Sequence, residues 1–172
     1  GTVAGVTLLE GAEGALLPQG NRRVAVPELS AELLDQVAFA RLAIEPKLAE
    51  LAALRLTPAA IDRLELIDAA VSRAIDTGNL PDYLGANHAF HFAIYEAANA
   101  PVLLDMARSL WLRAGPSLRA VIDRFGREAA PDLHHVAIVA MRAGNAGALA
   151  DAIRRDIQQG IDHVRQALAE AT

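Results

Sequence analysis

The chain has 172 residues, a formal net charge of −5, 53% hydrophobic residues and 4% aromatic residues. This length fits one domain that buries its own core, and the absence of cysteine excludes disulfides. The acidic charge argues against direct binding to nucleic acid phosphates, and the few aromatic residues exclude a stacking platform for single-stranded bases. No apolar run reaches the roughly 18 to 20 residues that span a bilayer, and no signal-peptide pattern opens the chain. We therefore expect a soluble cytoplasmic protein with no membrane partner.

The first 29 residues differ from the rest because five glycines interrupt them. Short strand-like runs at residues 15–17 and 23–26 flank turn-forming residues at 18–21, which predicts a β-hairpin. An isolated hairpin is only marginally stable in water. We therefore expect it to be the edge of a domain whose remainder is missing from this chain.

From Ser30 onward, apolar residues recur at the three- and four-residue spacing of amphipathic helices. Ser30 is a suitable N-cap for a first helix that reaches about residue 56 and that Pro46 should bend. Later helices are expected from Thr57-Pro58 to Gly78, over residues 82–98, from Pro101 with an interruption at Gly115-Pro116, from Pro131 to Gly144, and from Asn145 to about residue 168. The sequence thus predicts an all-α fold, an antiparallel bundle of six or seven helices preceded by a short β-hairpin.

Four polar residues fall on the apolar faces of these helices, namely Asn87, His91, His134 and Asp156. A buried polar group costs free energy unless a partner satisfies it. Two imidazoles and one carboxylate form a ligand set that suits divalent zinc, nickel, manganese or iron. Alternatively, each is a hydrogen-bonded core residue. Spacing alone leaves both interpretations open, because the residues lie on separate helices.

The other histidines are expected at the surface. His88 and His135 face about 100° away from the inward histidines, and His163 lies near the end of the last helix. Arg41 falls on the buried side of the first helix. It either pairs with Glu45 one turn later or directs its guanidinium into the bundle, where it would bind the carboxylate of a small ligand.

The segment Asn87-His88-Ala89-Phe90-His91, followed by Asn99 and by His134 ten residues before Gly144-Asn145, carries a resemblance to a known family. It resembles the C-terminal ligand-binding (FCD) domain of FadR-type regulators in the GntR superfamily, which typically reads Asp-x-x-Phe-His, then Asn, then His leading to Ala-x-x-x-Gly-Asp. The Arg41 to Glu45 spacing also resembles the first helix of that domain. The match covers residue 30 to about residue 164.

The resemblance implies a division of the chain and a site. Residues 1–29 would be the remnant of a winged helix DNA-binding domain, with its wing hairpin and linker, whose helix-turn-helix is largely missing. Residues 30–172 would be the helical effector-binding and dimerisation domain. This chain has Asn87 where the family usually has aspartate, and Asp156 where the last helix usually supplies a third histidine. The resemblance therefore implies a metal of altered preference or weaker binding, or a metal-free pocket in which His91 and His134 bind the effector directly.

The function that we predict is effector sensing by a regulator of transcription, not catalysis. A small organic acid would bind at or beside a divalent metal, with zinc, nickel or manganese favoured, in a homodimer that contacts operator DNA through its N-terminal domain. The predicted metal ligands are His91, His134, Asp156 and Asn87, and the predicted effector-binding residue is Arg41. One alternative is a helical metalloenzyme with a two-histidine, one-carboxylate site, although the Glu-x-x-His pairs of di-iron bundles are absent. Another is a metal-free dimerisation module with inert core polar residues.

Overall fold

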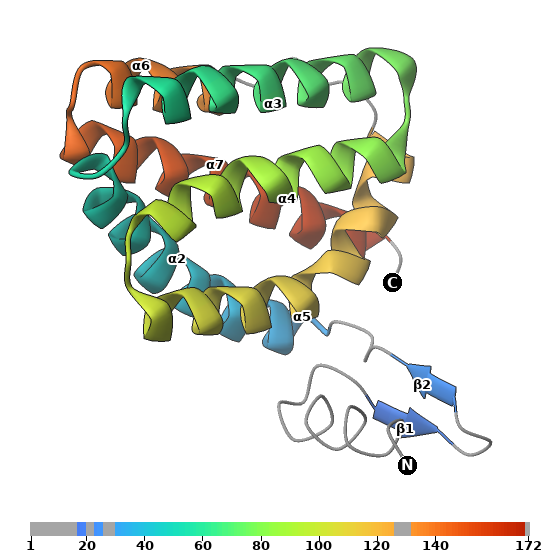
Figure 1. Ribbon diagram of the computed structural model, residues 1–172. Helices are drawn as coiled ribbons and strands as arrows, with labels where there is room; N and C mark the ends of the chain where they lie inside the picture. Colours follow the sequence, from blue (N-terminus) through green and yellow to red (C-terminus); the bar gives the residue numbers. More distant parts are fainter. Residues whose placement is uncertain (1–16, 20–22, 26–29, 126–131, 171–172) are drawn as a thin grey trace.

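The computed structural model describes residues 17–19, 23–25, 30–125 and 132–170, with side chains for most of the helical part. Within these residues the chain forms one two-stranded antiparallel hairpin and six helices (Figure 1). The elements are β1 (Leu17–Gln19), β2 (Arg23–Ala25), α2 (Ala31–Ala53), α3 (Pro58–Thr77), α4 (Leu80–Ala97), α5 (Pro101–Phe125), α6 (Leu133–Arg142) and α7 (Ala146–Glu170). The predicted helical bundle with a preceding hairpin is confirmed.

The helices begin where polar side chains cap their first turns. Ser30 Oγ accepts a hydrogen bond from the backbone N–H of Leu33, and Thr57 Oγ1 accepts one from Ala60. Each cap satisfies a backbone donor that the helix itself leaves unpaired. At the other end of α3, Gly78 adopts the left-handed conformation with φ of +66°, which glycine reaches without steric cost. These local signals explain why the predicted and observed boundaries of α2 and α3 agree closely.

Some expected details differ in the structure. The interruption at Gly115-Pro116 is wrong, because α5 runs through both residues, whereas α2 runs through Pro46 as expected. A proline inside a helix removes one backbone hydrogen bond, and a long helix that packs on its neighbours tolerates that loss. The predicted turn residues Pro18 and Gln19 belong to β1, which pairs with β2 in the register Leu17↔Ala25, so the connection falls on residues 20–22, outside the described residues.

Helix α6 begins at Leu133 with Asp132 as its N-cap, whereas we expected it to begin at Pro131. Pro131 itself lies outside the described residues. The Asp132 carboxylate accepts a hydrogen bond from the backbone N–H of His135, the geometry of a first-turn cap. This start places His134 in the first turn of α6, next to Asp68 of α3.

The helices pack in three tiers in the view of Figure 1, with α3 and α6 above, α4 and α7 in the middle, and α2 and α5 below. Helix α2 packs mainly along α7, which lies at the other end of the chain, while α3 packs against α4 and α6. Buried side chains from all six helices join in one apolar core. Helices α4, α6 and α7, which carry the inward polar residues, therefore meet inside this core.

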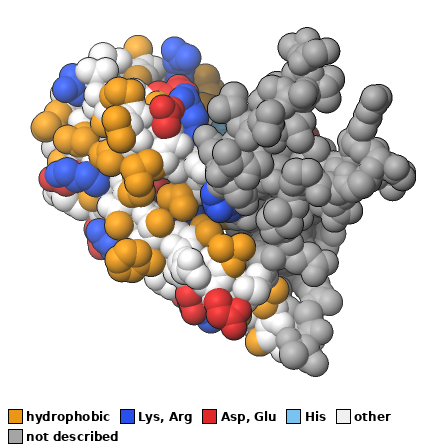
Figure 2. All heavy atoms as spheres, turned by 90° about the horizontal axis from the view of Figure 1, so that it is seen from below, with side chains coloured by type: hydrophobic (Ala, Val, Ile, Leu, Met, Phe, Trp, Pro, Cys, Tyr) orange, Lys and Arg blue, Asp and Glu red, His pale blue; other side chains and the backbone are white. Residues whose placement is uncertain are grey.

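The underside of the bundle exposes several large hydrophobic side chains. Figure 2 shows them gathered over the described part of this face. The exposed large hydrophobic side chains of α2 and α5 are Phe39, Val102, Met106 and Leu112.

Among the described helices, none combines the length and the apolar character that crossing a membrane requires.

Candidate functional site

Three of the four inward polar residues meet in space. His91 from α4, His134 from α6 and Asp156 from α7 each offer one ligand atom, and these atoms all lie within 4.8 Å of one another. His91 Nε2 is 3.0 Å from Asp156 Oδ2, and His134 Nε2 is 3.9 Å from Asp156 Oδ1. Both histidines are buried, and the Asp156 side chain is 25% exposed. The structure thus brings together residues that lie on three separate helices.

Aromatic rings hold the two imidazoles in place. Phe90 stacks on His134 with 3.9 Å between ring centroids, and it meets the neighbouring His91 edge to face at 5.8 Å. Trp111 from α5 lies 5.3 Å from the His91 ring. Phe90 and His91 are adjacent on α4. This helix therefore supplies both His91 and the phenyl ring that packs against His134.

The protonation of His91 follows from its buried neighbours. Its Nδ1 lies 3.1 Å from the Tyr95 hydroxyl, which donates its hydrogen bond to Glu45 Oε2 at 2.7 Å. Burial, together with the charge of Glu45, raises the pKa of Tyr95 well above its usual range, so this hydroxyl keeps its single proton. The hydroxyl oxygen can then only accept from His91, so Nδ1 of His91 carries a hydrogen and donates it to Tyr95.

His134 is fixed in the same way by a residue that the sequence analysis did not single out. Its Nδ1 lies 3.0 Å from Oδ1 of Asp68 on α3. A carboxylate accepts hydrogen bonds, so the Nδ1 N–H of His134 donates to Asp68. Asp68 comes four residues after Leu64 and three before Val71, both buried. The face criterion that found His134 could therefore also have found Asp68.

The remaining group, Asp156, is ionised. Burial opposes its charge, but the hydrogen bond to His91 and the charges of His91, His134 and Arg41 outweigh burial and lower its pKa below the usual range. Nearby, burial and the charge of Asp156 raise the pKa of Tyr83 to about 12. Asp156 thus has two imidazole Nε2 atoms beside it, and a hydrogen on Nε2 or a bound cation would join the three groups.

This donor set fits a divalent metal ion. Two imidazoles and a carboxylate are a ligand set that divalent zinc, nickel and manganese accept, and their candidate ligand atoms lie within 4.8 Å of one another. Asp68 and Tyr95 supply the outer hydrogen bonds that commonly orient metal-binding imidazoles. The chemistry of the residues present therefore fits a divalent ion, and the 3.0 Å between His91 Nε2 and Asp156 Oδ2 is also the length of a direct hydrogen bond.

The other candidates lie around this cluster. Asn87 is half-buried one turn before His91 on α4. His88 and His135 are exposed, and His163 is partly exposed. His88 stacks on Phe92, and partial burial with the nearby charge of His91 lowers its pKa. The three outer histidines therefore take the surface positions that the sequence predicted.

Arg41 takes the first of its two predicted roles. Its Nε and Nη2 donate to the two carboxylate oxygens of Glu45, and its guanidinium lies over the Trp111 ring at 4.6 Å. Glu45 is completely buried and also accepts from Trp111 Nε1 at 3.0 Å. Although burial disfavours the charge of Arg41, the charge of Glu45 more than offsets it and raises the pKa of Arg41. Sequence spacing indicated this pair but not the tyrosine and tryptophan that complete it.

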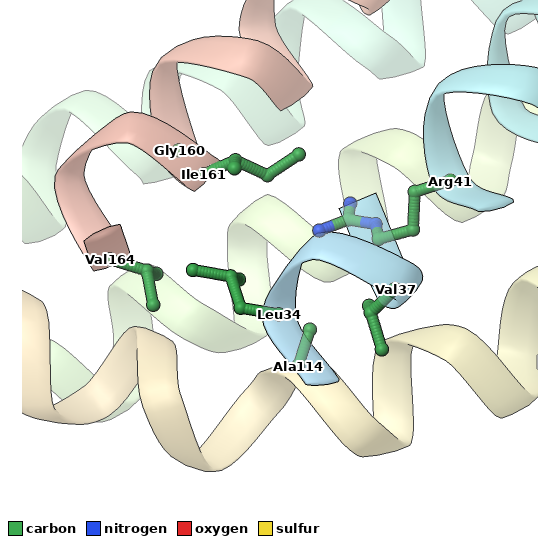
Figure 3. Close-up of a pocket in the computed structure, with 7 residues that line it drawn as sticks. All are labelled: Leu34, Val37, Arg41, Ala114, Gly160, Ile161 and Val164. Carbon is green, nitrogen blue, oxygen red and sulfur yellow. The ribbon is translucent and has the colours of Figure 1, made fainter. Parts of the chain in front are cut away.

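The outer end of Arg41 borders a small pocket between α2, α5 and α7 (Figure 3). The pocket is lined by Leu34, Val37, Arg41, Ala114, Gly160, Ile161 and Val164. Gly160 follows Asp156 by one helical turn of α7. Arg41 is the one charged residue among those that line this pocket.

Comparison with known protein families shows that residues 36–159 of the chain match the model of the FCD domain. The chain belongs to the FCD domain family. A curated relative, the HTH-type transcriptional regulator McbR of Escherichia coli strain K12, is 27% identical over 140 residues. That match covers 79% of this chain but 63% of McbR, so this FCD chain matches less than two thirds of the relative's length.

Solved structures share the FCD fold. E. coli McbR/YncC has a TM-score of 0.85 at 24% identity, covering 95% of this chain and 83% of its own. A GntR-family regulator from Pseudomonas syringae pv. tomato str. DC3000 has a TM-score of 0.62 at 15% identity, with coverage of 95% and 69%. Streptococcus agalactiae GntR has a TM-score of 0.58 at 19% identity, with coverage of 91% and 78%. The predicted FCD assignment is confirmed, and these relatives are transcriptional regulators, not enzymes.

Proposed function

We propose that this FCD chain is the effector-sensing domain of a DNA-binding transcriptional regulator, and that it binds a small carboxylate beside a divalent metal. His91, His134 and Asp156 would hold the metal. The observation that carries the proposal is the convergence of two imidazole Nε2 atoms, each with its Nδ1 hydrogen committed elsewhere, on one ionised carboxylate. Membership of the FCD family and the regulatory relatives support the functional class.

Charge explains why the effector would be an anion. A divalent ion bound by two neutral imidazoles and one carboxylate retains a positive charge, which would attract a carboxylate to the site. Arg41 adds a second buried cation at the edge of the adjoining pocket. Asn87, one turn before His91, would supply a weaker neutral ligand than the aspartate usual in the family. Zinc, nickel and manganese are the metals that we favour.

Metal binding is tested on chain that has been treated with chelator, dialysed and titrated with zinc, nickel or manganese in a calorimeter. We expect one ion per chain, and stabilisation by about 2.7 kcal/mol when free metal exceeds the dissociation constant 100-fold. The double variant His91→Ala with His134→Ala should lose this binding. The matched control is His88→Ala with His135→Ala, which removes two exposed histidines from the same helices and should keep it. Stoichiometric binding by the first variant, or none by the unaltered chain, would overturn the metal proposal.

The effector and the partners follow from the same proposal. Mass spectrometry of the denatured protein would identify a small acid that co-purifies with it. We infer that residues 1–29, with the β1–β2 hairpin, are the wing and linker of a DNA-binding domain, which would contact operator DNA. Helix α2 follows this hairpin and carries Arg41, so a bound acid would reach the DNA-binding part through α2. An acid can shift the regulator only if it binds two arrangements with different affinity.

We also propose that the regulator is a homodimer. The exposed hydrophobic side chains on α2 and α5 offer an apolar surface for a second copy of the chain. Sedimentation equilibrium would show a dimer mass that the variant Val102→Lys with Met106→Lys reduces to that of a monomer. A monomer mass for the unaltered chain at high concentration would contradict this part of the proposal.

A further inference from the structure

Helix α2 lacks one of its own backbone hydrogen bonds, and a side chain from α7 replaces it. Pro46 lies inside α2 and is buried. In an α-helix each backbone N–H donates to the carbonyl four residues earlier, and proline has no N–H, so the carbonyl of Leu42 receives no bond from residue 46. Arg154 on α7 donates from Nη1 to this carbonyl oxygen at 3.1 Å. A guanidinium of one helix thus takes the place of the amide that proline removes from another.

This contact lies beside the turn of α2 that carries the Glu45 centre. Arg41 and Glu45 are each one residue before the two ends of the missing bond, and their buried side chains pair inside the core. On α7, Arg154 is exposed and comes two residues before Asp156, whose charge acts on Arg41. Helices α2 and α7 are therefore linked on their inner side by charge and on their outer side by Arg154.

A second outer link between these helices is of a different kind. Arg165 Nη2 on α7 lies 2.9 Å from Asp35 Oδ1 on α2, and both side chains are at least half exposed. Surface ion pairs of this kind contribute little to stability. The acceptor of Arg154 is instead a backbone carbonyl without its helical donor, at the point where a helix bends most readily. Loss of Arg154 should therefore affect the backbone of α2 itself.

We propose that Arg154 is a positioning residue that fastens α7 to the proline turn of α2, residues 42–46. The bond from Arg154 to the Leu42 carbonyl, which we call the proline latch, holds the turn of Arg41 and Glu45 in place. Because the latch joins the helix that carries Asp156 to the helix that follows the hairpin, a displacement of α7 would pass into α2. This last step rests on the proposed function, since it assumes that a bound metal acts on Asp156.

The latch is tested by a double-mutant cycle on metal-free chain, measured by urea denaturation. Arg154→Met keeps the aliphatic part of the side chain and removes the donor, and it should raise the equilibrium constant for unfolding about 3- to 10-fold. Pro46→Ala restores an amide that can donate to the Leu42 carbonyl. In that background Arg154→Met should change the constant less than about twofold, and any packing defect left by Pro46→Ala cancels in the comparison.

Fluorescence of Trp111 shows whether the turn moves. Trp111 is the single tryptophan of the chain, and its Nε1 donates to Glu45. Arg154→Met should shift the emission maximum, whereas Pro46→Ala with Arg154→Met should emit as Pro46→Ala alone does.

The matched control is Arg165→Met, which removes the other outer link between α7 and α2. It should have the same small effect on stability with proline or alanine at position 46, and it should leave the Trp111 emission unchanged. Equal effects of Arg154→Met in the two backgrounds, or an unshifted emission maximum in that variant, would overturn the latch.

The passage of a displacement into α2 is tested by hydrogen exchange with and without saturating zinc. We expect zinc to slow amide exchange in α2 of the unaltered chain, and this slowing should be at least about twofold weaker in Arg154→Met but retained in Arg165→Met. Equal slowing in all three chains would overturn this step. Failure of zinc to bind the unaltered chain would instead count against the proposed function, and the double-mutant cycle would still decide the latch.

Discussion

Two buried polar centres adjoin one another in this bundle, and each is built around a carboxylate with different partners. In the Glu45 centre, a carboxylate accepts hydrogen bonds from Arg41, Tyr95 and Trp111, so each acceptor faces a donor. In the second centre, the Asp156 carboxylate has the Nε2 atoms of His91 and His134 as neighbours, at 3.0 Å and 3.9 Å. A buried polar group is stable only with a partner. The first centre is therefore complete within the chain, whereas Asp156 is joined to the histidines either by a hydrogen on Nε2 or by a bound cation.

The largest expected effect is on the Glu45 centre. Glu45→Ala leaves the Arg41 guanidinium buried without its anion, so we expect a loss of about 3 to 5 kcal/mol in the free energy of unfolding, measured by urea denaturation. The control Glu50→Ala removes a surface carboxylate from the same helix, where it pairs with Lys47, and should cost at most about 1 kcal/mol. If the two variants proved equally stable, the Glu45 centre would not have the structural role assigned to it.

The second prediction concerns Asp68, whose carboxylate accepts a hydrogen bond from Nδ1 of His134 and so orients that imidazole toward Asp156. Asp68→Asn removes the charge that holds the Nδ1 hydrogen of His134, and loss of such an outer partner typically weakens metal binding about 10- to 100-fold. Calorimetric titration with zinc would measure this change. Asp62→Asn, on the same helix but paired at the surface with Arg142, serves as the control and should bind zinc normally. Equal affinities in the two variants would show that Asp68 does not act on the site.

The sequence predicted those features of the fold that depend on local chemistry. The N-caps Ser30 and Thr57 and the left-handed Gly78 each act within a few residues, so the ends of their helices could be predicted from the sequence. The predicted break at Gly115-Pro116 was wrong for the opposite reason. The low helix propensity of two residues is weak compared with the packing of a long helix, and α5 continues through both.

For the candidate site, the sequence predicted which side chains face inward but not where they meet. His91, His134 and Asp156 lie on helical faces that periodicity identifies, yet their convergence depends on how α4, α6 and α7 pack. The partners that fix the histidine tautomers, Asp68 and Tyr95, come from other turns and helices. Hydrogen-bond partners far apart in sequence follow from tertiary packing, so periodicity alone does not pair them.

The smallest expected change in stability is also the one that best separates the two explanations of the second centre. In metal-free chain, Asp156→Asn replaces an acceptor by an amide that can donate to the free Nε2 of His91. If the site is built for a metal, this variant should unfold within about 1 kcal/mol of the unaltered chain, or be slightly more stable, while losing metal binding.

A different result is expected if an added proton on His91 already joins the two groups as an ion pair. Asp156→Asn would then leave a buried charge without its partner and lower the free energy of unfolding by about 3 to 5 kcal/mol, as at Glu45. Urea denaturation in the presence of chelator distinguishes the two outcomes. A large loss would make the second centre a closed structural pair like the first, whereas a neutral substitution would mean that its partner is a ligand from outside the chain.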